Sequence, residues 1–171
     1  QLKAGQTVLI QGAAGNVGAY AVQLAHQAGL RTFATAAMDD ISFVRELGAN
    51  TVVNFQADRF EDAVRDADAV LDLVGGETQE RSFLVLRQGG KLISAVSRPD
   101  QRLAKLHCVE AAFFLVNVTS QHLADIAGLL DGDLGLALAD GDFGFLLGLD
   151  LLPGRVRARG ARRDLRLTAI L

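Results

Sequence analysis

The stretch Gly12-Ala13-Ala14-Gly15-Asn16-Val17-Gly18 decides the fold of this chain. It follows the β-branched and apolar run 7–10, which predicts a strand, and it has no bulky side chain that would hinder a tight turn. Beyond the turn, apolar residues recur with the period of one helical face, and Gly29 is placed to end the helix. These apolar positions are Val17, Ala21, Leu24 and Ala28. The stretch therefore joins a strand to a helix.

The same alternation repeats along the chain. Further strands are predicted at 31–35, 51–55, 69–74, 91–96 and 111–118, and further helices at 41–47, 60–64, around Phe83 and Leu86, and at 123–130. Continuous apolar strands alternating with amphipathic helices predict a parallel sheet, because each right-handed crossover lays a helix over the sheet. We therefore expect an α/β protein with a doubly wound Rossmann fold: a six-stranded parallel sheet with helices on both faces.

The character of the sequence changes after Asp131. Acidic residues without basic neighbours come first, and six arginines between Arg155 and Arg166 follow almost without acids. Block-like charge with scattered glycine and little periodicity is typical of a solvated tail. We therefore expect a dinucleotide-binding domain over residues 1–131 and a divergent C-terminal tail over 132–171. The chain starts at Gln1 rather than Met, so we expect it to be part of something longer.

Composition excludes several functions. The net charge of −3 gives no electrostatic attraction to nucleic acid or to an anionic membrane, so neither is expected as a partner. Cys108 is the only cysteine, which excludes an intrachain disulfide and a cysteine-rich zinc site. No apolar run approaches the roughly 20 residues of a membrane helix. A cytoplasmic location is therefore expected.

The loop of residues 12–18 is suited to binding an anion. Glycine lets the backbone turn sharply and approach a diphosphate, and the following helix presents free N–H groups and a positive dipole. In the spacing G-x-G-x-x-G the three motif positions are Ala13, Gly15 and Gly18, with an additional Gly12 before them. The loop's place after the first strand favours dinucleotide binding. A turn that serves only chain reversal is the alternative.

The second strand gives the first indication of the cofactor. About 20 residues after the loop an acidic residue would bind the adenosine ribose of NAD, but Ala36 stands there. Ala36 would not repel a 2′-phosphate, and Arg45 on the next helix can pair with one, so NADP(H) is favoured over NAD(H). Asp39 and Asp40 are close by and can either cap that helix or bind ribose hydroxyls.

Several blocks of residues 1–131 resemble the zinc-independent quinone oxidoreductases, which include zeta-crystallin, of the medium-chain dehydrogenase/reductase superfamily. The blocks are 2–10, 12–18 with 21–25, 47–50, 72–78, 86–92 and, more loosely, 113–116. In that family an alanine stands where this loop has Ala13. The resemblance extends over the cofactor-binding domain only. It implies that the family's N-terminal GroES-like domain, which carries most of the substrate pocket, is absent from this chain.

The resemblance also implies roles for individual residues. Gly15, Asn16, Val17 and Gly18 would hold the pyrophosphate through their backbone, and Val74 and Gly75 would flank the cofactor ribose. Phe114, Leu115 and Val116 would bracket the nicotinamide carboxamide, and the sixth strand can pair with its copy in a homodimer. The sequence departs from NADP-binding members at Ala37-Met38-Asp39, where a Ser-Arg-Asn-like run is expected.

The implied function is hydride transfer from NAD(P)H to a quinone or an α,β-unsaturated carbonyl, a small-molecule substrate, without zinc. The cofactor supplies the reacting atom in such chemistry, and the protein supplies orientation and support. His26, His107 and His122 have no metal-ligand spacing. Cys108 follows His107, but adjacent side chains usually diverge, and Tyr20 on the first helix is more simply a residue of the domain surface. No catalytic residue is therefore predicted. This chain alone is expected to be inactive. The alternative is a non-enzymatic dinucleotide-binding module, such as a redox sensor or a structural protein.

Overall fold

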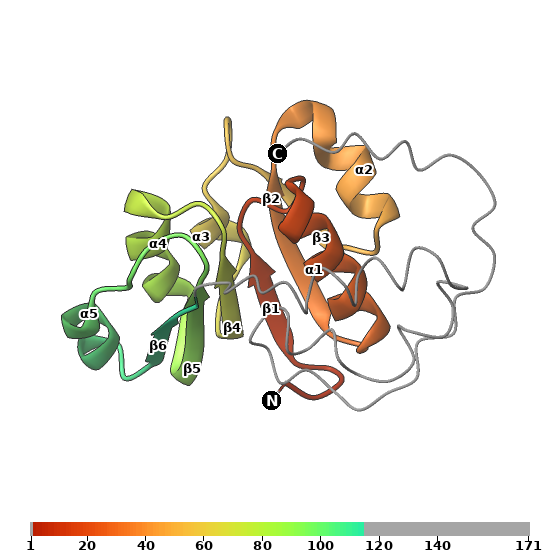
Figure 1. The fold of residues 1–171 in the computed structure, drawn as a ribbon. Helices are drawn as coiled ribbons and strands as arrows, with labels where there is room; N and C mark the ends of the chain where they lie inside the picture. The colour runs from red at the N-terminus through yellow and green to blue at the C-terminus, as the bar shows by residue number, and fades with distance from the viewer. Residues whose placement is uncertain (1, 115–171) are drawn as a thin grey trace, which may run out of the picture. The chain divides into compact units, whose positions relative to one another are not determined.

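The computed structural model describes residues 2–114, which form one parallel sheet with helices on both faces. The strands lie in the order β3-β2-β1-β4-β5-β6, and every neighbouring pair is parallel (Figure 1). Their bounds are β1 Thr7–Ile10, β2 Arg31–Ala36, β3 Thr51–Asn54, β4 Ala67–Asp72, β5 Leu86–Ser94 and β6 Glu110–Phe113. This order is that of two mononucleotide-binding halves, so the predicted doubly wound fold is confirmed.

The helices cover the two faces of the sheet in two groups. Their bounds are α1 Asn16–Gln27, α2 Ile41–Glu46, α3 Phe60–Ala63, α4 Gly76–Ser82 and α5 Gln101–Leu106, with short 3-10 turns η1 Met38–Asp40 and η2 Phe83–Val85. Val22 of α1 and Val44 of α2 belong to one apolar core, whereas Phe60 of α3 and Ala104 of α5 belong to the other. Figure 1 shows α1 and α2 apart from α4 and α5, which cover the opposite face. None of the helices within residues 2–114 is long and apolar enough to cross a membrane.

Successive residues of the central strands enter alternate cores. Val8 and Ile10 pack on the side of α1, whereas Leu9 between them packs on the side of Phe83 and is fully buried. Because both faces of the sheet are covered, these strands are apolar throughout rather than alternating with polar residues. The two cores fix the register of the sheet and therefore the positions of the loops at its edges.

The fourth and fifth strands differ from the sequence prediction. The strand predicted at 69–74 is β4, which ends at Asp72, because the Asp72 carboxylate takes the N–H groups of Val74 and Gly75 out of the sheet. The helix predicted around Phe83 and Leu86 is also wrong. Helix α4 precedes Phe83, and Leu86 begins β5 by pairing with Ala67 across a register shift.

Helix α5 was missed by the sequence analysis, which predicted no helix between the fifth and sixth strands. It contains only six residues, too few to give a clear helical period. Its start is marked by Asp100, whose carboxylate accepts a hydrogen bond from the Arg102 N–H at 2.7 Å. A Pro-Asp pair before Leu103 and Leu106 was therefore the available signal. The predicted helix at 123–130 and the end of the sixth predicted strand lie outside the described residues.

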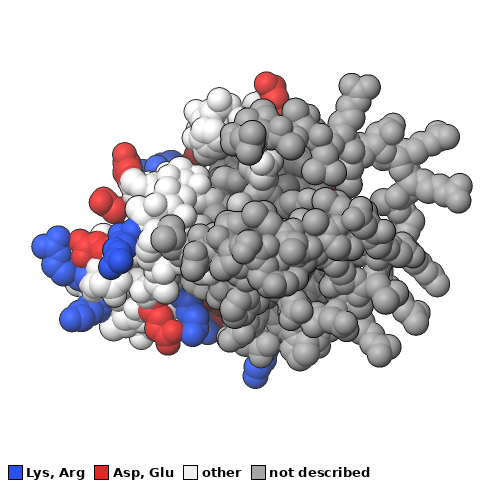
Figure 2. All heavy atoms as spheres, in the orientation of Figure 1, with Lys and Arg blue, Asp and Glu red and all other residues white. Residues whose placement is uncertain are grey.

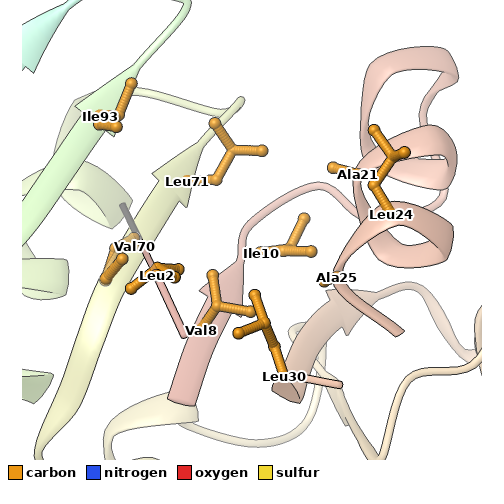
Figure 3. A pocket seen from close by; sticks show the side chains of 11 residues that line it. Leu2, Val8, Ile10, Ala21, Leu24, Ala25, Leu30, Val70, Leu71 and Ile93 are labelled. Atoms are coloured by element: carbon orange, nitrogen blue, oxygen red, sulfur yellow. The ribbon is translucent and has the colours of Figure 1, made fainter. Parts of the chain in front are cut away.

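A small apolar groove lies on the α1 side of β1, β4 and β5 (Figure 3). Leu24 of α1, Ile10, Leu71 and Ile93 contribute to its lining, together with Leu2. The crossovers that lead from β3 to β6 place their helices on the other face, so within residues 2–114 no helix covers this side of β4 and β5. All the lining side chains are apolar, so the groove continues the core and has no group that would bind a charged ligand.

Candidate functional site

The loop of residues 12–18 connects β1 to α1 at the carboxyl edge of the sheet, beside the point where the strand order reverses. The Gly12 N–H donates to Thr35 Oγ1 at 3.1 Å, and the Ala13 N–H donates to the Thr35 carbonyl at 3.0 Å. The Thr35 hydroxyl donates in turn to the buried Gln11 Oε1 at 2.7 Å. The first half of the loop is therefore fixed to the end of β2.

Two glycines of this loop are required by its geometry. Gly12 has a φ of +71°, a backbone conformation that residues with a Cβ rarely adopt. Gly18 lies against the loop itself: a Cβ at position 18 would overlap the Gly12 carbonyl oxygen and lie 2.7 Å from the Ala13 Cα. At Gly15 a Cβ would meet only the Gly12 carbonyl oxygen, at 3.4 Å. The close packing of α1 on the loop therefore depends on position 18.

The start of α1 offers donors to an anion. The first N–H groups of a helix have no carbonyl partner within it, and in α1 they belong to Asn16, Val17 and Gly18. Gly15 and Asn16 are exposed. No acidic residue lies in the first turn of α1, so no carboxylate there takes up these N–H groups or repels an anion. Together with the helix dipole these groups form a cradle for a diphosphate. The residues present therefore fit the pyrophosphate of a dinucleotide.

The loop after β4 lies beside this cradle. Val74 is half exposed, and its Cγ2 atom is 3.1 Å from the position of a Cβ on Gly12. Gly75 is buried with a φ of +78°. The structure thus brings Val74 next to the loop of residues 12–18, as expected for two parts of one site.

A buried polar cluster behind this loop was missed by the sequence analysis. The Asp72 carboxylate is inaccessible to solvent and accepts hydrogen bonds from Val74 N–H, Gly75 N–H, Gln79 and Ser94. The available signal was an acidic residue that ends an apolar strand and precedes a glycine pair. A buried carboxylate needs such donors, because without them its desolvation is costly.

The candidate adenosine side of the site lies at the end of β2. Ala36 is only 2% exposed, so its methyl group offers no polar contact. Asp40 occupies the N-cap position of α2, but its side chain makes no capping hydrogen bond. Arg45 is exposed in the last turn of α2, so η1 and the first turn of α2 lie between it and Ala36. These residues share one region without forming a closed pocket.

The opposite side of the site is described only in part. Phe114 follows β6 and its N–H donates to the Ser94 carbonyl at 2.8 Å, which holds the chain beside the end of β5. Leu115 and Val116 lie outside the described residues. Of the three residues predicted at the nicotinamide, only Phe114 belongs to the described part of the chain.

The other candidate residues are distributed over α1 and the segment after α5. His107 follows α5 and stacks on Phe83 with 6.1 Å between ring centroids, and Cys108 is exposed with a φ of +54°. His26 packs against Gly48 at the end of α2, and Tyr20 is exposed on α1. Within residues 2–114 no group of three or more His, Cys, Asp or Glu side chains is placed to hold a metal ion.

Charges of both signs are mixed on the face of Figure 2 that carries α4 and α5. Arg81 forms a two-point ion pair with Glu61, at 2.6 Å for both contacts, and also lies over the Phe60 ring. The hydrogen bond from Arg81 lowers the pKa of Glu61 from 4.5 to about 2, against the opposing effect of burial.

At the amino edge of the sheet, burial raises the pKa of Asp68, but hydrogen bonds from Thr7 N–H, Arg87 and Gln6 hold it below its ordinary value.

Comparison with known proteins places this chain in a family. The model of the zinc-binding dehydrogenase family matches residues 16–124. The NADPH-dependent alkenal/one oxidoreductase of Arabidopsis thaliana chloroplasts is 32% identical over 107 residues, which are 60% of this chain. The chain spans 27% of the length of that relative.

Solved structures agree with this placement. The quinone oxidoreductase of Coxiella burnetii superposes with a TM-score of 0.65 and 32% identity, over 75% of this chain and 42% of that one. The quinone oxidoreductase of Escherichia coli in complex with NADPH has the same fold, with a TM-score of 0.64 and 22% identity over 76% and 45% of the two chains. The resemblance stated from the sequence is therefore confirmed. This chain belongs to the zinc-binding dehydrogenase family, and its described part is a Rossmann domain similar to that of the quinone oxidoreductases.

Proposed function

We propose that this chain is the cofactor-binding part of an NAD(P)H-dependent reductase that transfers hydride to a quinone or an α,β-unsaturated carbonyl. The observation that carries the proposal is the cradle at the start of α1. Gly18 allows the helix to pack on the loop, and the N–H groups of the first turn, which have no partner within the helix, lie at the carboxyl edge of the sheet. This edge, at the reversal of the strand order, is where open α/β sheets bind dinucleotides.

The bound nicotinamide supplies the hydride, and the residues of this chain bind and orient the cofactor. Gly12, Ala13 and Gly15 to Gly18 would hold the pyrophosphate, with Val74 and Gly75 at the ribose. Phe114, followed in sequence by Leu115 and Val116, would contact the nicotinamide end. The proposed substrate class is supported by the names of the relatives, an alkenal/one oxidoreductase and quinone oxidoreductases.

NADP(H) is the proposed cofactor. The end of β2 carries Ala36 in place of a carboxylate, so no acidic side chain at that position repels a 2′-phosphate, and the exposed Arg45 offers a positive charge nearby. The relative from Arabidopsis thaliana is named as NADPH-dependent. Zinc independence, the cytoplasmic location, the boundary at residue 131 and a homodimer through the sixth strand stay predictions.

Titration of the 171-residue chain with NADPH and NADH, followed by the fluorescence of the reduced nicotinamide, tests the proposal. We expect saturable binding of both cofactors and tighter binding of NADPH. Competition by NADP⁺ would show that the signal reports a specific site. If neither cofactor binds at millimolar concentration, the proposal is wrong. If NADH binds much more tightly than NADPH, only the preference argued from Ala36 and Arg45 is wrong.

A further inference from the structure

Asp72 is a fully buried carboxylate at the last position of β4. Its Oδ1 atom accepts the N–H groups of Val74 at 3.0 Å and of Gly75 at 2.8 Å. Its Oδ2 atom accepts Gln79 Nε2 and the Ser94 hydroxyl, each at 2.7 Å. All four donors are uncharged. The charge of Asp72 is thus balanced by directed hydrogen bonds from the loop after β4, from α4 and from the end of β5, and each bond is stronger for that charge.

This carboxylate connects two loops at the carboxyl edge of the sheet. Ser94 Oγ, which donates to Asp72, also accepts the N–H groups of Val96 and Ser97 at 3.2 Å each. Gln79 Nε2 reaches from α4 to the Ser97 carbonyl at 3.2 Å. The loop after β4 and the loop after β5 are therefore held by one network, and Asp72 lies at its centre.

The same network reaches the cradle of the phosphate loop. Asp72 holds Val74, whose Cγ2 atom lies 3.1 Å from the position of a Cβ on Gly12. Gln11, the buried residue before Gly12 in the sequence, donates to Ser82 Oγ of α4 at 3.3 Å. A shift of the loop after β4 would therefore change its fit against the glycine loop.

We propose that Asp72 is a positioning residue for the nicotinamide half of the bound dinucleotide, acting by holding the loops after β4 and β5 in place. The inference rests on the function proposed above. In this fold each half of the sheet binds one half of the dinucleotide, and the second half begins at β4. The adenosine half would lie beside β2 and β3, and the hydrogen bonds described above for Asp72, Gln79 and Ser94 reach neither of these strands.

The test compares the whole cofactor with its adenosine half. Asp72→Asn keeps the shape of the side chain but leaves one acceptor oxygen, so one pair of donors must face an NH₂ group. We expect Asp72→Asn in the 171-residue chain to weaken NADPH binding about tenfold. The affinity for adenosine 2′,5′-bisphosphate should stay within about twofold, because that ligand contacts only the first half of the site. Calorimetric titration of both ligands measures this split.

Asp68→Asn is the matched control, because Asp68 lies on the same strand at the opposite edge of the sheet. It should leave both affinities unchanged. Ser94→Ala is a second variant for the case that Asp72→Asn does not fold, and it should show the same split with a smaller loss, about threefold. Hydrogen exchange gives an independent reading: the amides of Val74 and Gly75 should lose protection in Asp72→Ala, which removes their acceptor, while those of β1 keep it.

The outcomes separate the two proposals. If wild-type protein binds NADPH and Asp72→Asn binds it equally well, or loses both ligands to the same degree, Asp72 is not a positioning residue although the proposed function stands. If wild-type protein binds neither ligand, the proposed function fails, and the inference about Asp72 fails with it.

Discussion

Strand β4 carries an aspartate near each of its ends, and the two are held in opposite ways. Asp68, near the amino end, accepts the Thr7 N–H, Gln6 Nε2 and Arg87 Nε, so hydrogen bonds join it to the start of β1 and an ion pair joins it to β5. Asp72, at the carboxyl end, accepts four uncharged donors, two from the loop after β4, one from α4 and one from β5. An arginine thus neutralises the aspartate near the amino end of β4, whereas the aspartate at the carboxyl end is balanced by uncharged donors only.

The largest expected effect is a difference in stability between the two aspartates. Asp72→Ala leaves four donors without an acceptor in the protein interior, and we expect the free energy of unfolding to fall by roughly 3–4 kcal/mol. Asp68→Ala should cost about 1 kcal/mol, because water can reach its donors at the edge of the sheet. Urea denaturation of both variants measures the difference. Equal losses would mean that the two ends of β4 are held equally strongly.

The glycines of the two edges give the second comparison. Gly18→Ala places a methyl group against Gly12 and Ala13, so we expect NADPH affinity to fall by more than about a hundredfold. Gly29→Ala, at the amino edge, strains a residue with a φ of +69° and should cost about 1 kcal/mol of stability. NADPH affinity should not change in that variant. A Gly18→Ala protein that binds NADPH normally would contradict the proposed cradle.

Ion pairing also predicts how stability depends on pH. The pKa of Glu61 is lowered from 4.5 to about 2 in the folded protein by its hydrogen bonds to Arg81. Because the folded pKa is the lower one, the stabilisation is present above about pH 4.5 and is lost as the pH falls towards 2. Glu61→Gln should therefore be less stable than wild type at pH 6, and the two should converge near pH 2. Chemical denaturation across this range tests the expectation, and a constant difference would exclude the ion pair as its source.

The succession of strands and helices along most of the chain could be predicted from local signals in the sequence. Strand β1, the glycine loop and α1 were found because apolar runs, small residues and Gly29 mark their limits within a few residues of one another. The secondary structure of the region from Leu73 to Leu86 was predicted wrongly, because hydrogen bonds and strand pairing with other parts of the chain determine it. Leu86 becomes a strand residue by pairing with Ala67, and nothing local in the chain indicates that pairing.

The sequence predicted the part of the candidate site that depends on backbone conformation, the glycine loop, but not the part that depends on side-chain contacts. Gly12 and Gly18 are needed for the backbone conformation and close packing of the loop, which small residues in the sequence indicate. The network of Asp72, Gln79 and Ser94 joins positions up to 22 residues apart, and its members have no common spacing. Such a network depends on which strands become neighbours, so only the folded chain can show it.

The smallest expected effect concerns the choice between the two cofactors. If the exposed Arg45 pairs with a 2′-phosphate, Arg45→Ala should reduce the preference for NADPH over NADH by about two- to fivefold, the magnitude of a solvent-exposed ion pair. The matched control is Arg31→Ala, which removes an exposed arginine from the amino end of β2, where it lies over the Phe33 ring. That variant should leave the preference unchanged. The two affinities should be measured at low and at physiological salt, because an exposed ion pair weakens with ionic strength. If the preference for NADPH depends neither on Arg45 nor on salt, uncharged groups at the end of β2, such as the backbone from Ala37 to Met38, would bind the 2′-phosphate. The carboxyl edge would then make no charged contribution to cofactor binding.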